Sequence, residues 1–331
     1  MNTYSFIGKS GATAFLFPGQ GSQEVGMGHA LAEKYPSAAA AFQEADDVLG
    51  IELSRLCFAG PEETLTDTIN AQPALLATSV ATLRAIESEL DGRIPAAADG
   101  PSSYVAGHSM GEYTALVAVG SLAYADALRL VRERGRLMQK AGQTAPGLMA
   151  AILGMEESRV AEVCAEVTVG SRLAQVANDN CPGQVVISGN QEGMEAAMEA
   201  LRKAGARKVV PLAVSIAAHS PLMAPVAAEL GEVIDATPLN AAKTPLIANT
   251  SAEPIQTVDA IRAELKAQLT GSVRWTASMG CAIDAGINRF VEIGPGNVLA
   301  SLVKRVQRKS ERLTVNDPDG VAALVAVLLE A

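Results

Sequence analysis

The sequence predicts an α/β fold in two parts: a large subdomain with a mostly parallel sheet, and a small antiparallel subdomain inserted into it. In residues 1–144 and 216–331, short apolar β-like runs alternate with longer helix-like runs, which is typical of a parallel sheet covered by helices. Between these stretches, residues 145–215 follow the order βαββαβ, the ferredoxin-like split unit. With 331 residues, 49% of them hydrophobic, the chain is long enough to bury two cores.

Each element is predicted from the length and period of its apolar run. In the large subdomain, the strands are expected at 13–17, 103–107, 245–249 and 289–294. Its helices are expected near 24–35 and 72–90, directly after the GHSMG segment at 107–111, at 124–141, near 257–269 and at the C-terminus. In the small subdomain, strands are expected at 148–153, 173–178, 184–189 and 207–214, and helices at 156–166 and 191–204. The Ala-rich stretch at 94–99 is expected to be a solvated loop.

Composition and charge exclude several classes of function. The net charge of −10 argues against nucleic acid as a partner. The N-terminus lacks the apolar core of a signal peptide, and no apolar run approaches the roughly 18 residues of a membrane span. The cysteines lie far apart, with no C-x-x-C pair and no clustered histidines; they are Cys57, Cys164, Cys181 and Cys281. We therefore expect a cytoplasmic protein without a metal site, a disulfide framework or a membrane anchor.

The segment GHSMG follows a predicted strand and precedes a predicted helix. In such an arrangement, the G-x-S-x-G pattern of hydrolase-like folds holds the serine in a strained turn, and the glycines keep side chains away from it. The hydroxyl of Ser109 would then stand at a helix N-terminus, where N–H groups can stabilise an oxyanion. The pattern also occurs by chance in glycine-rich loops, but the flanking strand and helix favour a nucleophile.

A nucleophilic serine needs a base, and the chain has three histidines. His108 is the neighbour of Ser109, so we expect its side chain to point away from the hydroxyl and to be structural. His29 lies in an amphipathic stretch and is expected at the surface. His219 lies at the end of an apolar strand-like run, where catalytic groups tend to occur, and is the candidate base. A structural loop histidine, held by hydrogen bonds, is the alternative interpretation.

One arginine falls on an apolar helix face. The predicted helix at 124–141 carries Arg134 on the same stripe as Val131 and Met138. A buried guanidinium needs an anionic partner, because an unpaired buried charge is very costly. Two interpretations are open: Arg134 forms a structural ion pair or snorkels to the surface, or its partner is a free carboxylate that arrives with the substrate.

These segments together resemble the malonyl-CoA:acyl carrier protein transacylases of fatty acid and polyketide synthesis. The matching segments occur in the family's order and span nearly the whole chain, so the set is specific although each motif alone is not. They are PGQGSQ at 18–23, PEETLTDT at 61–68, QPALL at 72–76, GHSMGEY at 107–113, the Arg134 helix, NDNCPGQVVISG at 178–189, HSPLM at 219–223, LKAQL at 265–269, VRW at 273–275 and EIGPG at 292–296.

The resemblance implies transfer of a malonyl group from malonyl-CoA to the phosphopantetheine thiol of an acyl carrier protein, through a malonyl-serine ester and with ping-pong kinetics. It implies that Ser109 is the nucleophile, His219 the base and Arg134 the residue that binds the malonyl carboxylate. Coenzyme A then enters as part of a thioester substrate, and no bound cofactor is expected.

The resemblance also implies roles for four residues around this centre. The backbone N–H groups of Gln20 and Met110 match the oxyanion hole, the main-chain carbonyl of Gln268 matches the group that orients the histidine, and Gln72 lies in a motif that lines the site. The sequence departs from the family pattern at Ala218, where relatives often have serine or phenylalanine. The smaller side chain leaves room near the acyl α-carbon, which argues against strict selection of malonyl.

Other classes of protein remain open at this point. A serine esterase or thioesterase of the α/β-hydrolase type shares G-x-S-x-G, but its histidine follows an acid late in the chain, and no histidine follows His219 here. The chain could also serve another malonyl-using system, or be a non-catalytic docking subunit. An acidic carrier protein would need a local basic patch on this acidic chain. Two candidates are the run at 303–312 and the cluster of Arg202, Lys203, Arg207 and Lys208.

Overall fold

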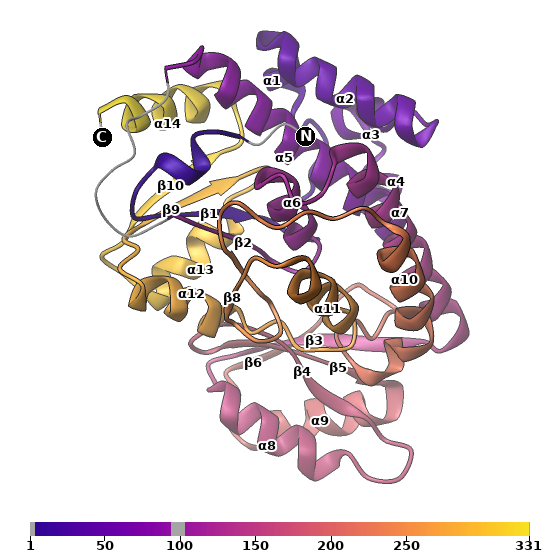
Figure 1. The fold of residues 1–331 in the computed structure, drawn as a ribbon. Helices are drawn as coiled ribbons and strands as arrows, with labels where there is room; N and C mark the ends of the chain where they lie inside the picture. Colours follow the sequence, from indigo (N-terminus) through magenta and orange to yellow (C-terminus); the bar gives the residue numbers. More distant parts are fainter. Residues whose placement is uncertain (1–3, 94–102, 331) are drawn as a thin grey trace.

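The computed structural model describes residues 4–93 and 103–330, and the predicted loop at 94–99 lies outside them. Figure 1 shows a large sheet in the upper part of the molecule and a small sheet below it. The large sheet has the order β10-β9-β1-β2-β7-β8, with parallel pairing throughout except between β7 and β8. Its strands are β1 (Thr13–Phe17), β2 (Tyr104–Gly107), β7 (Leu246–Ile247), β8 (Pro254–Ile255), β9 (Arg289–Ile293) and β10 (Glu311–Val315).

The central strand β1 contributes to a separate core on each face of the large sheet. Because side chains alternate along a strand, Phe15 and Phe17 lie on one face and Ala14 and Leu16 on the other. The first core also contains side chains of α1 (His29–Lys34), α2 (Pro36–Leu49), α3 (Leu53–Ala59), α4 (Glu62–Thr66), α5 (Thr68–Leu90), α6 (Gly111–Ala118), α7 (Tyr124–Thr144), α10 (Ala224–Ala236), α11 (Val258–Gln268) and α14 (Pro318–Glu330). The second contains side chains of α12 (Trp275–Asp284) and α13 (Val298–Val306).

The small sheet is antiparallel and has the order β4-β5-β3-β6. Its strands and helices are β3 (Gly147–Leu153), α8 (Glu157–Val167), β4 (Ala174–Cys181), β5 (Gln184–Asn190), α9 (Gln191–Lys203) and β6 (Lys208–Pro211). Ile152, Ile187 and Leu201 belong to its own apolar core, which α8 and α9 cover on the side away from the large sheet (Figure 1). This is the predicted βαββαβ unit. Backbone hydrogen bonds from Val273 to Ala177 and from Asp179 to Val273 join β4 to the large subdomain.

Some predicted boundaries were wrong, for local reasons. The helix expected near 24–35 begins only at His29, because Gly26 and Gly28 have positive φ angles of 101° and 77° that belong to turns. The strand expected at 207–214 ends at Pro211, which pairs with Ala150 at the edge of the small sheet. Further elements were missed altogether: α2, α3, α4, α10, α12, α13, β8, β10 and two short 3₁₀ turns at Ile7–Lys9 and Pro221–Met223.

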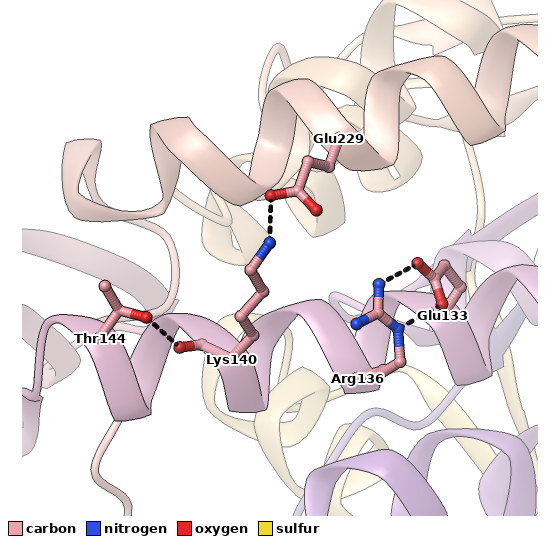
Figure 2. Close-up of polar contacts among 5 residues, drawn as sticks. All are labelled: Glu133, Arg136, Lys140, Thr144 and Glu229. Carbon is pink, nitrogen blue, oxygen red and sulfur yellow. Dashed lines mark hydrogen bonds and ion pairs between the residues drawn. The ribbon is translucent and has the colours of Figure 1, made fainter.

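The outer face of α7 carries cations that are already paired with carboxylates (Figure 2). Arg136 forms two hydrogen bonds of 2.7 and 2.6 Å with Glu133 one turn earlier. The ammonium of Lys140 lies 2.6 Å from the Glu229 carboxylate of α10, with both side chains about half exposed. The main-chain carbonyl of Lys140 accepts a hydrogen bond from the Thr144 hydroxyl. Exposed pairs of this kind contribute little to stability. Because these charged side chains lie on the outer face, the opposite, apolar face of α7 packs against the core.

None of the described helices is long and apolar enough to cross a membrane. All four cysteines are free thiols.

Candidate active site

Three neighbouring parallel strands end at one edge of the large sheet and deliver polar groups to it. The loop after β1 contains Gln20, the turn after β2 contains Ser109, and Asn249 follows β7. Ligand sites of open parallel sheets lie at the carboxyl ends of the strands. A cavity of about 480 Å³ lies here. Its lining includes Gln20, Ser109, Met110, Arg134, Met138, Ala218, His219 and Leu302.

The turn that holds Ser109 is tight and strained, as predicted. Ser109 has a φ angle of +52°, in the left-handed region that residues other than glycine rarely adopt. A Cβ atom at Gly107 would lie 2.0 Å from the Gly111 carbonyl carbon, and one at Gly111 would lie 2.1 Å from the Phe17 carbonyl oxygen, so neither position leaves room for a larger residue. Asn249 fixes the turn: its Oδ1 accepts from the Ser109 N–H at 2.7 Å, and its Nδ2 donates to the Gly107 carbonyl at 2.7 Å.

His219 lies beside the hydroxyl of Ser109, with 2.9 Å between Nε2 and Oγ. Its Nδ1 lies 2.9 Å from the carbonyl oxygen of Gln268 and 3.1 Å from that of Gly271. Because two acceptors face Nδ1, this nitrogen carries the proton and Nε2 is free to accept one. Burial, and the nearby Arg134 cation, lower the pKa of His219 to about 4. The imidazole is therefore a neutral base in the resting site.

The other two histidines lie where the sequence places them. His108 is turned away from Ser109: its Nε2 lies 2.8 Å from Asn180 Oδ1, and its ring is 5.4 Å from that of Trp275. Burial lowers the pKa of His108. The side chain of His29 is 53% exposed, and its only close carboxylate among the described residues is Glu33 of the same helix.

Arg134 is 1% exposed and surrounded by neutral acceptors. Its Nη1 donates to Gln72 Oε1 at 2.9 Å and approaches the Met138 sulfur at 3.4 Å. Its Nη2 donates to Gln268 Oε1 and to Ser109 Oγ, both at 3.0 Å. Its Nε has no partner within residues 4–93 and 103–330. The guanidinium thus reaches the nucleophile directly.

No carboxylate in the described part of the chain forms an ion pair with Arg134, so the structural ion pair considered from the sequence is not found there. Burial lowers the pKa of Arg134, and the neighbouring Tyr113 and Glu112 oppose this shift. The Tyr113 ring lies 5.7 Å from the guanidinium carbon and offers its electron-rich face. A positive charge held mainly by neutral groups favours an anion from outside the chain.

Gln20 and Met110 both line the cavity, and the backbone N–H of each has no hydrogen-bond partner in the described part of the chain. Met110 is the N-cap of α6, so its N–H lies at the positive end of that helix. The Gln20 side chain donates to Thr68 Oγ1 at 3.2 Å. Two backbone N–H donors without a described partner, on residues that line the cavity beside Ser109, suit an oxyanion hole. Within the described residues, no group of three or more His, Cys, Asp or Glu could hold a metal ion.

Sequence reasoning missed two buried residues of this site, Glu112 and Asn249. The Glu112 carboxyl accepts from the Asn249 N–H at 2.9 Å, from Asn249 Nδ2 at 3.0 Å and from Gln268 Nε2. Burial, and the nearby Glu264 carboxyl, raise the pKa of Glu112. The available signal was a single glutamate in the first turn of the otherwise apolar helix that follows Ser109.

The fold and the arrangement of the site indicate an acyl transferase, and comparisons with known proteins agree. Residues 14–325 match the acyl transferase domain family. The chain belongs to the malonyl-CoA:acyl carrier protein transacylase family. It is 45% identical over 317 residues to the malonyl CoA-acyl carrier protein transacylase of Bacillus subtilis, covering 96% of this chain and 97% of the relative.

Solved structures of similar proteins share the whole architecture. The malonyl CoA-acyl carrier protein transacylase of Coxiella burnetii superposes with a TM-score of 0.90 at 36% identity, covering 97% of this chain and 99% of that one. A malonyl-transacylase solved in complex with a type II polyketide synthase acyl-carrier protein superposes with a TM-score of 0.88 at 39% identity, covering 95% of this chain and 99% of that one.

Proposed function

We propose that this chain transfers a malonyl group from malonyl-CoA to the phosphopantetheine thiol of an acyl carrier protein. One observation carries the choice of acyl group: the Arg134 guanidinium, without a carboxylate partner in the described chain, lies 3.0 Å from the Ser109 hydroxyl. In a malonyl thioester, a single methylene group separates the free carboxylate from the reactive carbonyl. One substrate can therefore place its carboxylate on Arg134 and its carbonyl over Ser109.

In the first half-reaction, His219 Nε2 takes the proton of the Ser109 hydroxyl as Oγ attacks the thioester carbonyl. The resulting oxyanion accepts hydrogen bonds from the N–H groups of Gln20 and Met110. The protonated imidazole is held by the two main-chain carbonyls that face its Nδ1. Coenzyme A leaves as the carbon–sulfur bond breaks, takes the proton from His219, and a malonyl ester of Ser109 remains.

In the second half-reaction, the thiol of the carrier's phosphopantetheine arm takes the place of coenzyme A. His219 accepts its proton, the sulfur attacks the ester carbonyl, and the proton returns to Ser109 Oγ as the malonyl thioester leaves. Water is the competing nucleophile. The main-chain carbonyls that orient His219 replace the carboxylate used by hydrolase triads, and the sequence offers no acid in that position.

Both half-reactions are completed by serine, histidine and arginine side chains. We therefore propose that no bound cofactor takes part and that coenzyme A enters only with the substrate. We further propose a place in cytoplasmic fatty acid synthesis. The subdomain boundaries at 144/145 and 215/216 stay predictions.

Intact-mass spectrometry after mixing with malonyl-CoA tests this function. We expect a malonyl adduct on Ser109 that persists until holo carrier protein is added and then moves to the carrier. The Ser109→Ala variant is the matched control and should stay unmodified. Rapid release of free malonate without a carrier would indicate a hydrolase, and the absence of any adduct would indicate a docking subunit.

A further inference from the structure

Glu112 lies behind the catalytic residues and faces only donors. It is fully buried in the first turn of α6. Oε1 accepts two hydrogen bonds from Asn249, and Oε2 accepts from the side-chain amide of Gln268. No acceptor in the described part of the chain contacts the carboxyl, so both oxygens act only as acceptors. Glu112 is not among the residues that line the cavity, and its carboxyl does not contact Ser109 Oγ.

This arrangement fixes the orientation of the Gln268 side chain. Its Nε2 donates to two acceptors, the Glu112 carboxyl and the Ser109 carbonyl, the latter at 3.0 Å. Its Oε1 must therefore point the other way, where it accepts from Arg134 Nη2 at 3.0 Å. A flipped amide would face Arg134 with its NH₂ group and the two acceptors with its oxygen, which loses three hydrogen bonds in a buried site.

The consequence for Arg134 is that it is held in position without being neutralised. The acceptors on its Nη atoms are amide oxygens, a hydroxyl and a thioether. The nearest carboxyl in this network, that of Glu112, is separated from the guanidinium by one amide. Glu112 thus holds the guanidinium in place through Gln268 but leaves the charge-assisted contact to an incoming carboxylate.

We propose that Glu112 is a specificity-positioning residue: through Gln268 it holds Arg134 in the geometry that binds a carboxylate-bearing acyl group. This inference rests on the proposed function of Arg134. Glu112 acts through two other residues and not on the substrate, so its removal should change the choice of acyl donor more than the ability of Ser109 to be acylated.

The Glu112→Gln variant tests the proposal because it keeps the size of the side chain but replaces one acceptor oxygen with an NH₂ donor. Two donors face Oε1 and one faces Oε2, so the new NH₂ group meets the fewest donors when it faces Gln268, and the Gln268 amide is then expected to turn. We expect the ratio of kcat/KM for malonyl-CoA to that for acetyl-CoA to fall by at least about 10-fold, mainly through a higher KM for malonyl-CoA. A parallel loss with both donors would overturn the proposal.

Asn249→Ala is the matched control, because the Asn249 side chain donates to Glu112 Oε1, the oxygen that Gln268 does not contact, and also holds the Ser109 turn. It should lower kcat with both donors and leave their ratio within about 3-fold of the starting value. If this variant changes the ratio as much as Glu112→Gln does, general distortion explains the effect and the proposal fails.

The double variant Glu112→Gln/Gln268→Glu decides the question if the single variant does not fold. It keeps one carboxylate and one amide in the network but puts the carboxylate next to Arg134. We expect a folded protein in which Arg134 is paired internally and the preference for malonyl is lost. Retention of the starting preference would overturn the proposal.

Arg134→Ala, measured alongside, separates the two levels of the argument. If Arg134→Ala leaves the donor ratio unchanged, the proposed role of Arg134 fails and the inference about Glu112 fails with it. If Arg134→Ala lowers the ratio but Glu112→Gln does not, only the inference about Glu112 fails.

Discussion

Arg134 Nη2 lies 3.0 Å from Ser109 Oγ, so the cation proposed to select the acyl group and the nucleophile proposed to receive it are in direct contact. The two residues belong to different elements, with Ser109 in the turn after β2 and Arg134 in the middle of α7. The contact explains how one cavity can combine recognition and chemistry. It also has an electrostatic effect on the base, because the same cation lowers the pKa of His219.

We expect His219→Ala to reduce malonyl transfer by several orders of magnitude, on the order of 10³-fold or more, because no other described residue is placed to take the Ser109 proton. The matched control is His29→Ala, which removes an exposed ring on α1 and should leave transfer unchanged. The measurement is the initial rate of carrier malonylation. Substantial activity in the His219 variant would show that another group is the base.

The rate of Ser109 modification should fall at acid pH with the depressed pKa of His219, and this fall is the acid limb of its pH profile. The imidazole is the active base when neutral, and its pKa of about 4 keeps it neutral well below the usual pH range for histidine. The rate of Ser109 modification by a neutral sulfonyl fluoride should therefore fall only as the pH approaches about 4. Removing the cation in Arg134→Ala should move this limb to higher pH. A limb near 6.5 in the unmodified protein would contradict the geometry.

Ala218 should permit a substituent on the acyl α-carbon. It lines the cavity next to His219, and a methyl side chain leaves room that a larger residue would fill. Pockets distinguish one methyl group by about 1–3 kcal/mol, so methylmalonyl-CoA should be a poorer donor than malonyl-CoA by about 10- to 200-fold. Ala218→Phe should widen this difference. The hypothesis fails if the unmodified protein prefers malonyl by more than about 10,000-fold.

The basic run at 303–312 should contribute to binding of an acidic carrier protein. It begins in α13, whose Leu302 lines the cavity, and Arg305 donates to Gln184 at the cavity lining at 3.0 Å. Reversing Lys304 and Arg305 to glutamate should raise the KM for carrier protein, and added salt should reduce the difference. The control is Lys34→Glu on α1, outside the residues that line the cavity. An unchanged KM at low ionic strength would exclude this surface.

The sequence predicted the fold, and it singled out Ser109, His219 and Arg134, which the structure brings together, because their signals are local. Most strands of the two sheets are compact apolar runs, and GHSMG, HSPLM and the arginine on an apolar stripe of α7 can each be recognised within a few residues. The elements that were missed lack such signals. For example, β10 is half exposed at a sheet edge, so its apolar alternation is weak.

Glu112 and Asn249 could not be assigned from the sequence, because their roles arise only from contacts across the fold. They lie 137 positions apart, and nothing near either residue indicates the other. From the sequence alone, Glu112 is one of the acidic residues common in the first turn of a helix, where the carboxylate interacts with the helix dipole and with solvent. The parallel pairing of β2 with β7 brings the two residues together.

The comparison of Arg134→Ala with Arg136→Ala tests most directly the claim that a buried, unneutralised arginine selects malonyl. Arg136 lies on the same helix but pairs with Glu133 at the surface (Figure 2), so its variant controls for loss of a cation from α7. For Arg134→Ala, kcat/KM with malonyl-CoA should fall by about 10- to 100-fold, which corresponds to a charge-assisted contact of about 1.5–3 kcal/mol.

With acetyl-CoA, which has no carboxylate, kcat/KM of the Arg134 variant should stay the same or rise, and Arg136→Ala should change neither donor. A parallel loss of kcat/KM with both donors, accompanied by a lower Tm, would contradict the claim and assign Arg134 to the scaffold.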